Sequence, residues 1–330
     1  MARNATNQLL QKAKKLKKDE FYTQLVDIES ELQYYKVHFD GKTVFCNCDN
    51  PMTSNFYKYF VDNFHSLGLK SVIAACYVEQ NYNLFEQPSP TQKGFYCEYN
   101  GDGSEPKIQY FDGNGDFRSR ESIELLKKSD IVVTNPPFSL FREYVAQLVR
   151  YDKKFLIIGN VNAITYKEIF KLIQENKAWL GVNLGRGISG FIVPDNYELY
   201  GTETRIDSIG NKIISPNNCL WLTNLDNFCR HEDVVLTKKY CGNETYYPKY
   251  DNYDGINVDK TQDIPIDYQG YMGVPITFLH KFNPNQFEIV KFRKGNDEKD
   301  LSINGKCPYF RILIKHKRFS NIKVEQEIMF

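Results

Sequence analysis

Residues 130–150 read DIVVTNPPFSLFREYVAQLVR, and this stretch decides the fold. Asp130–Thr134 is a short apolar run of the kind that forms a buried strand. Ser139–Arg150 follows with the spacing of an amphipathic helix. Its apolar residues on one face are Phe141, Tyr144, Val145 and Leu148. A strand, a proline-fixed turn and a helix in this order predict one unit of a parallel sheet.

The chain repeats this alternation on both sides of that unit. We expect further strands at 42–48, 71–77 and 155–158. Helices are expected at 54–64 and 164–175. Strands that are apolar on both faces and separated by helices predict an α/β fold with a parallel sheet covered by helices on both sides. Residues 80–115, rich in Gly, Pro, Asn and Tyr, break the rhythm and are interpreted as an inserted excursion.

The composition changes after residue 224. Residues 225–330 are rich in Tyr, Asn, Asp and Lys, are punctuated by prolines, and predict a separate module that is mostly irregular or contains strands. We therefore expect three regions: a basic N-terminal region at 1–40, an α/β domain at 41–224 and the module at 225–330.

Composition excludes several classes of protein. A chain of 330 residues with 42% hydrophobic residues, 23 Tyr and 23 Phe has ample material for a core. It has no apolar run of the roughly 20 residues that span a bilayer, and its start lacks a secretion signal, so we expect a cytoplasmic protein. The eight Cys are scattered and the five His isolated, which favours free thiols and no metal site. Cys46 and Cys48 are interpreted as buried strand cysteines.

The net charge of +1 conceals a segregation of charge. Residues 1–18, here called the N-terminal arm, carry six basic residues and no acid, and residues 301–323 do the same. The last seven residues add two negative charges, so residues 19–300 hold −9. Basic ends are typical of contacts to a phosphate backbone, although solvated surface segments would have the same composition.

Asn135-Pro136-Pro137-Phe138 carries the chemistry, because it directly follows a buried strand. Ligands of doubly wound sheets bind beyond the carboxyl ends of the strands. Two prolines fix the backbone and remove two N–H donors, so the Asn135 side chain and the Pro136 carbonyl can both accept from one amino group. Such a grip would aim the nitrogen lone pair of a base at an electrophile, while Phe138 stacks on the ring. The alternative is a helix entry with proline punctuation.

This arrangement resembles the catalytic motif of amino-methyltransferases that use S-adenosylmethionine. Over nearly its full length the chain is similar to the EcoRI-type adenine-N6 DNA methyltransferases. Matching stretches include MARNATN, DEFYTQ, CNCD, LLKKSDIVVTNPPFSLF, NNCLWLTNLD and MGVPITFLHKFNP. The resemblance implies a Rossmann-like catalytic sheet, a cofactor-binding helix within residues 1–40 and a C-terminal target-recognition region.

The resemblance also implies where the cofactor binds. The expected contacts are Phe21, Tyr22 and Thr23 of DEFYTQ, Asp49, Glu79, the pair Asp116 and Phe117, and Asn135. The first turn, Asn47–Phe56, has no glycine, although Ser54-Asn55-Phe56 echoes the usual Gly-Asn-Phe ending. Read without the resemblance, DEFYTQ would be a plain helix cap, Asp49 a strand-end cap and Glu79 an exposed loop acid.

An adenine buried in a duplex must be rotated out before it is methylated, and a second aromatic ring is then needed on its far face. Besides Phe138, the candidates are Phe191, Tyr197 and Trp221. Expected DNA contacts are Lys14, Lys15, Lys17, Lys18, Arg186, Lys315 and Arg318. The resemblance implies methylation of the inner adenine of GAATTC by a monomer on double-stranded DNA, in functional pairing with a restriction endonuclease.

Two rival functions remain from the residues alone. The same tetrapeptide would serve an RNA or protein-glutamine amino-methyltransferase, although the long C-terminal module argues against this. A DNA-binding homologue that has lost catalysis through its glycine-free first turn is the second rival. Cofactor turnover with duplex DNA, RNA or protein as acceptor separates these possibilities.

Overall fold

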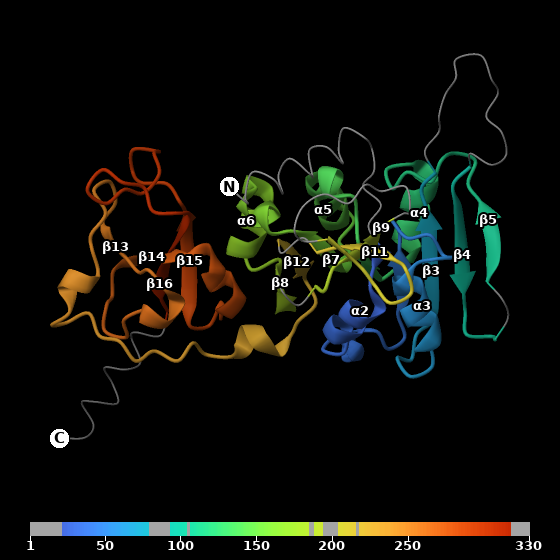
Figure 1. Cartoon of the computed structure of the whole chain (residues 1–330), viewed down its shortest axis with the longest axis horizontal. Coiled ribbons are helices and arrows are strands. Elements are labelled where there is room, and N and C mark those ends of the chain that lie inside the picture. The colour runs from blue at the N-terminus through green and yellow to red at the C-terminus, as the bar shows by residue number, and fades with distance from the viewer. Residues whose placement is uncertain are drawn as a thin grey trace, which may run out of the picture. The chain divides into compact units, whose positions relative to one another are not determined.

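The computed structural model describes residues 22–78, 93–103, 106–184, 188–193, 204–215 and 218–317. The chain divides into two compact units (Figure 1). Unit 1 comprises residues 1–169 and 180–225, and unit 2 comprises residues 170–179 and 226–330. In the described parts, no helix has both the length and the apolar character needed to cross a membrane.

An eight-stranded sheet forms the centre of unit 1, in the order β5-β4-β3-β2-β6-β7-β12-β8. The strands are β2 (Thr43–Cys46), β3 (Ser71–Cys76), β4 (Phe95–Tyr99), β5 (Lys107–Tyr110), β6 (Ile131–Thr134), β7 (Lys154–Asn160), β8 (Trp179–Leu184) and β12 (Cys219–Thr223). The four strands β3, β2, β6 and β7 pair in parallel, whereas β4, β5 and β12 add antiparallel pairs. The predicted α/β class is confirmed.

Helices cover both faces of this sheet (Figure 1). The helices α2 (Leu25–Leu32) and α3 (Asn55–Asp62) lie on one face, and α4 (Arg120–Lys128) and α5 (Phe141–Arg150) lie on the other. The helix α6 (Lys167–Gln174) follows β7 after a short 3-10 helix at Val161–Thr165. Another 3-10 helix, Phe138–Leu140, directly precedes α5, so the expected helix at 139–150 begins as a tighter turn.

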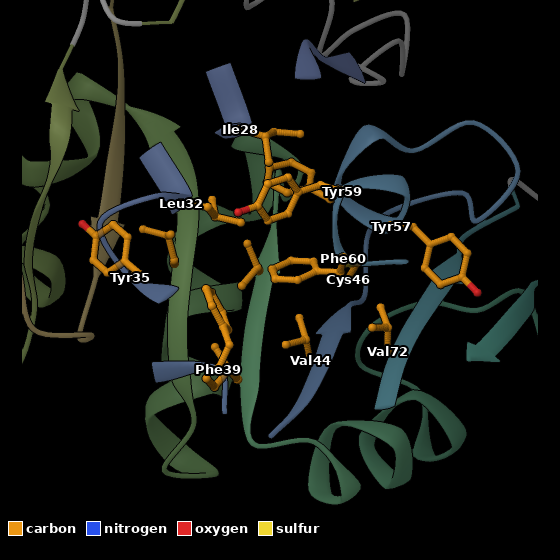
Figure 2. Close-up of a cluster of buried hydrophobic side chains, with 14 of the residues drawn as sticks. Ile28, Leu32, Tyr35, Phe39, Val44, Cys46, Tyr57, Tyr59, Phe60 and Val72 are labelled. Carbon is orange, nitrogen blue, oxygen red and sulfur yellow. The ribbon is translucent and has the colours of Figure 1, made fainter. Parts of the chain in front are cut away.

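The core beneath α2 and α3 forms because alternate residues of the parallel strands point to that face. Figure 2 shows Ile28 and Leu32 of α2 and Phe60 of α3 gathered over Val44 and Cys46 of β2. All five side chains are buried. The same cluster includes alternate residues of β3, β6 and β7, which fixes the sheet against the two helices.

A smaller antiparallel sheet in unit 1 joins segments that are far apart in the sequence. Its order is β1-β9-β11-β10, with β1 (Tyr22–Thr23), β9 (Phe191–Val193), β10 (Thr204–Ile206) and β11 (Lys212–Ile214). Thr23 pairs with Phe191, and Phe191 pairs on its other side with Ile214. The start of the described chain is therefore tied to the segment that follows β8.

Unit 2 is built on a four-stranded sheet in the order β13-β14-β16-β15. The strands are β13 (Gly255–Asn257), β14 (Tyr271–Pro275), β15 (Phe287–Phe292) and β16 (Arg311–His316). Short 3-10 helices at Phe228–His231 and Glu244–Tyr246 precede β13, and two others at Thr261–Asp263 and Ile276–Lys281 follow β13 and β14. Buried Phe278 and Phe287 meet at 5.3 Å between ring centroids. Short strands joined by irregular segments are what the composition of this region predicted.

Two local expectations need correction. Residues 80–115 are not only an excursion, because β4 and β5 form a hairpin that pairs with the edge of β3. Cys46 lies buried in β2 as expected, but Cys48 lies in the turn after that strand and is only partly buried.

All eight cysteines are free. No group of three or more His, Cys, Asp or Glu side chains in the described residues is arranged to hold a metal ion.

Candidate active site

The candidate site lies at the carboxyl ends of β2 and β6, which are neighbours in the sheet. Strand β3 pairs with β2 on one side, and β7 pairs with β6 on the other, so successive strands run outward in opposite directions from this point. In open α/β sheets, such a reversal leaves a crevice at the carboxyl ends of the strands. The segment Asn47–Asp49 follows β2 and Asn135–Phe138 follows β6, so both predicted segments meet at this edge.

Asp49 connects the two strand ends. Its carboxylate accepts a hydrogen bond from the hydroxyl of Thr134, the last residue of β6. A second hydrogen bond comes from Ser54 Oγ at 2.7 Å. Ser54 in turn caps α3 by accepting from the backbone N–H groups of Phe56 and Tyr57. Burial raises the pKa of Asp49 to about 6, and the two hydroxyl donors only partly offset this desolvation.

Asn47 ties the same turn to the helix that follows the tetrapeptide. Its side-chain oxygen accepts a hydrogen bond from the buried hydroxyl of Tyr144 on α5. The Tyr144 ring also contacts Phe117 edge to face, with 5.2 Å between centroids. Burial raises the pKa of Tyr144 well above its usual value, which keeps the phenol protonated as a donor.

The tetrapeptide itself is held in an extended turn. Pro136 is buried, and Asn135, Pro137 and Phe138 are partly buried. Pro137 has φ −55° and ψ 121°, and its carbonyl accepts a hydrogen bond from Leu140 N at 3.0 Å. The Phe138 ring lies edge to face against Phe191, with 6.3 Å between centroids and an interplanar angle of 77°. The backbone after β6 is therefore fixed by proline geometry and by the start of the next helix.

Of the predicted cofactor segment 21–23, Tyr22 and Thr23 are described. Thr23 is 4% exposed, and its Oγ1 is a buried atom with no hydrogen-bond partner within the described parts of the chain. Its carbonyl accepts a hydrogen bond from Asn55 Nδ2 at 2.8 Å, next to the Ser54 cap of α3. Buried hydroxyls are normally satisfied, so this atom is a candidate for contact with a ligand.

Asp116 and Phe117 precede α4, beside the end of β3. The loop is anchored there because Val78 N donates to Asn114 O at 2.9 Å. Asp116 accepts hydrogen bonds from the Arg118 guanidinium, at 2.8 Å from Nε and 2.6 Å from Nη2. These bonds lower the pKa of Asp116. Phe117 is 5% exposed, so it faces the core more than an open pocket.

Two of the aromatic candidates for the far face of the base are corrected by their burial. Trp221 lies in β12, is fully buried, and meets Phe56 edge to face at 6.0 Å. Phe191 is also fully buried, behind Phe138. A base stacks on an exposed ring face, and neither residue offers one in this structure.

Several predicted residues lie outside the described residues: Lys14, Lys15, Lys17, Lys18, Phe21, Glu79, Arg186, Tyr197 and Arg318. Lys315 is described separately, in unit 2. It lies on β16, is exposed, and its ammonium is 5.7 Å from the centroid of the Tyr271 ring.

Sequence reasoning missed Asn47, Thr134 and Tyr144. Asn47 and Thr134 stand at the ends of predicted strands, which is the signal that could have found them. Tyr144 was interpreted only as part of the apolar face of a helix. Its hydroxyl donates to Asn47, which lies 97 positions away in the sequence, and no local pattern reveals that contact.

Comparisons with known proteins show the family of the chain. The family described as adenine-specific methyltransferase EcoRI matches residues 9–317. The chain is 71% identical over 324 residues to the Type II methyltransferase M.EcoRI of Escherichia coli, covering 96% of this chain and 99% of that protein. It is 37% identical to the Type II methyltransferase M.MpnI of Mycoplasma pneumoniae, covering 93% and 98%. No solved structure matches. The chain belongs to the EcoRI family of adenine-specific DNA methyltransferases.

Proposed function

We propose that this enzyme transfers a methyl group from S-adenosylmethionine to N6 of the inner adenine of GAATTC in duplex DNA. The observation that carries the proposal is the junction of Asp49 with Thr134, which brings the first turn of the sheet against Asn135–Phe138. The target sequence comes from the identity of 71% with M.EcoRI. As a modification enzyme it would protect DNA from a cognate restriction endonuclease, and we propose that it acts as a monomer on DNA in the bacterial cytoplasm.

We propose further that the eight-stranded sheet is a Rossmann-like methyltransferase sheet. The order of its parallel strands, β3-β2-β6-β7, supports this, because β2 lies in the middle and the chain winds outward to both sides. In such a sheet the cofactor binds across the carboxyl ends of the strands on one side of the reversal and the substrate on the other. The turn after β2 would then be the cofactor side, and the tetrapeptide after β6 the substrate side.

Residues in the first turn and in two neighbouring segments fit this cofactor chemically. Its methionine end carries a carboxylate and an ammonium group. Thr23 Oγ1, buried and without a partner within the described residues, can donate to the carboxylate. Asp49 is a carboxylate suited to a cationic or hydroxyl group, and Asp116 would contact the adenosine end, whereas the ring of Phe117 is buried in the core. When bound, S-adenosylmethionine supplies the electrophilic methyl group.

The tetrapeptide would act on the amino group of the flipped adenine. This nitrogen is a poor nucleophile because its lone pair is delocalised into the ring. The Asn135 side-chain oxygen and the Pro136 carbonyl would each accept one N–H, which favours a tetrahedral nitrogen with its lone pair directed outward. Phe138 would stack on the base and hold it in register. The proton released after methyl transfer can pass to water, so methyl transfer needs no general base.

Unit 2 is the proposed target-recognition region, in line with the order of the motifs along the chain. Lys315 is exposed on β16 and supports this role as a cation able to contact phosphate. The basic N-terminal arm, Arg186 and Arg318 remain proposals based on charge, because they lie outside the described residues.

The test is methylation of plasmid DNA by the purified full-length protein. The methylated plasmid is challenged with a panel of restriction endonucleases, and modified adenines are mapped by sequencing. Protection confined to GAATTC, with N6-methyladenine at its inner adenine, is the expected result. Protection at a different site would overturn the target assignment alone, and methyl transfer to RNA or protein in place of DNA would overturn the proposed substrate.

A further inference from the structure

Two side chains near the start of the described chain hold one turn of unit 1. The carboxylate of Asp27, on α2, accepts hydrogen bonds from Ser189 N at 3.0 Å to each oxygen and from Ser189 Oγ at 3.0 Å. Gln24 Nε2 donates to the same Ser189 Oγ at 2.7 Å and to the Gly190 carbonyl at 2.8 Å. Asp27 is only 4% exposed. We call these contacts the Asp27 clamp.

The clamped turn leads directly into Phe191, the first residue of β9. The antiparallel pair of β1 with β9 sets Thr23 opposite Phe191. The fully buried Phe191 ring then packs edge to face against Phe138 of the tetrapeptide. One continuous series of contacts therefore runs from Asp27 through Ser189 and Phe191 to Phe138.

Other contacts restrict this turn to one conformation. Gly190 has φ +132°, a conformation that only glycine adopts readily. The Ser189 carbonyl accepts a hydrogen bond from Ser215 Oγ at 2.8 Å, and Arg205 Nη2 approaches it at 3.3 Å. A side chain packed against such a turn has little freedom to shift unless one of these contacts is lost.

We propose that Asp27 is a positioning residue for methyl transfer, which acts through Ser189 and Phe191 to fix the Phe138 ring against the target adenine. This rests on the proposed role of Asn135–Phe138. Asp27 itself would touch neither substrate nor cofactor, because its side chain is buried against Ser189. Asp27 affects the orientation of the target base. Loss of its carboxylate therefore lowers kcat more than it weakens the binding of DNA or S-adenosylmethionine.

Burial of the Asp27 carboxylate supports a dedicated role. Desolvation raises its pKa in spite of the hydrogen bonds from Ser189. A buried charge is retained at a cost to stability, and here three hydrogen bonds come from Ser189, the residue that begins the clamped turn. A misplacement of about 1 Å at a reacting centre can cost about 100-fold in rate.

The same helix offers a matched control. Glu31, one turn after Asp27 on α2, is fully buried and accepts hydrogen bonds from Val182 N at 2.8 Å, Asn183 N at 2.7 Å and Tyr35 Oη at 2.9 Å. Its pKa is likewise raised by burial. It holds β8, not the turn before Phe191. A Glu31 variant therefore shows how loss of a buried carboxylate on α2 affects the protein while the turn before Phe191 stays in place.

The experiment compares full-length D27N, S189A, F191L and E31Q with the wild type. For each, kcat and KM are measured on duplex GAATTC, affinity for S-adenosylmethionine by calorimetry, and Tm by thermal unfolding. We expect D27N and F191L to lower kcat about 10- to 100-fold, while KM for DNA and the affinity for S-adenosylmethionine stay within about threefold of the wild type. S189A keeps the hydrogen bonds from its backbone N–H to Asp27, so we expect a smaller decrease in kcat. If D27N does not fold, S189A and F191L test the proposal. E31Q lowers Tm but leaves kcat within about twofold.

A double variant completes the design. D27N combined with F191L should be no slower than the slower single variant, because both act through the same ring. The positioning role would be overturned if the decreases in kcat of the two single variants multiplied in the double variant. An equal decrease of kcat in E31Q would also overturn it. The proposed function has its own readout, since wild-type protein without DNA methylation, or a fully active N135A variant, would contradict it whatever D27N does.

Discussion

The side chain of Asp49 accepts a hydrogen bond from the hydroxyl of Thr134, and this one contact joins the carboxyl ends of β2 and β6. Asp49 follows the first strand of the parallel sheet, and Thr134 directly precedes Asn135-Pro136-Pro137-Phe138. The proposed cofactor side and the proposed substrate side of the site therefore share a hydrogen bond. A change at either residue is expected to reach both sides.

Asp49→Asn should alter how stability depends on pH. The pKa of Asp49 in the folded protein is about 6, above the value of 3.8 for an exposed aspartate, so the folded state holds this proton more tightly than the unfolded state. The wild type therefore loses stability, relative to the variant, as pH rises from about 4 through 6. At pH 7 the variant should be the more stable protein by up to about 3 kcal/mol. Thermal unfolding of both proteins between pH 4.5 and 8 measures the difference, and a constant difference across this range would contradict the assignment.

Asn135→Ala should abolish turnover, because the variant lacks one of the two acceptors for the adenine amino group. Loss of a preorganised hydrogen-bonding group at a reacting centre costs about 100-fold or more. Binding of duplex DNA, followed by fluorescence anisotropy, should change little. Asn135→Asp keeps an acceptor of similar shape and serves as the control, with partial activity expected. Normal kcat in Asn135→Ala would rule out the proposed mechanism.

Thr23→Val should weaken binding of S-adenosylmethionine without destabilising the free protein. The Thr23 hydroxyl is buried with no partner within the described part of the chain. Its removal therefore breaks no hydrogen bond there and removes a buried unsatisfied polar group. A lost hydrogen bond to the cofactor corresponds to a decrease in affinity of about 5- to 10-fold. Calorimetry and Tm measure the two effects. Thr23→Ser retains the hydroxyl and should bind as the wild type does; equal affinity in Thr23→Val would remove Thr23 from the proposed site.

Replacement of Lys14, Lys15, Lys17 and Lys18 by Gln should weaken DNA affinity and flatten its dependence on salt. Each lost phosphate contact reduces the slope of log K against log salt by about 0.9. Replacement of the same four residues by Arg keeps the charge and is the control. The prediction rests on the charge of the N-terminal arm, and an unchanged slope in the Gln variant would show that the arm does not contact phosphate.

Local sequence patterns determined much of the fold. The parallel strands could be recognised from four- to seven-residue apolar runs, and the helices from their spacing, because both signals repeat within one element. The tetrapeptide could be recognised because its prolines directly follow such a run. The hydrogen bond between Asp49 and Thr134 could be anticipated only in part, from the rule that polar residues at strand ends meet.

Tertiary structure alone decided the remaining features. The β4–β5 hairpin exists because the edge of β3 was open to pairing, which its Tyr- and Asn-rich sequence does not reveal. The ring of Trp221 is removed from the candidate site because β12 runs antiparallel beside β7 and turns this residue into the core. Asp27 meets Ser189 across 162 positions of sequence. Apolar periodicity is a property of neighbours in the chain, whereas these contacts depend on how distant segments pair and pack, so the sequence determined the elements and the tertiary structure decided which side chains reach the tetrapeptide.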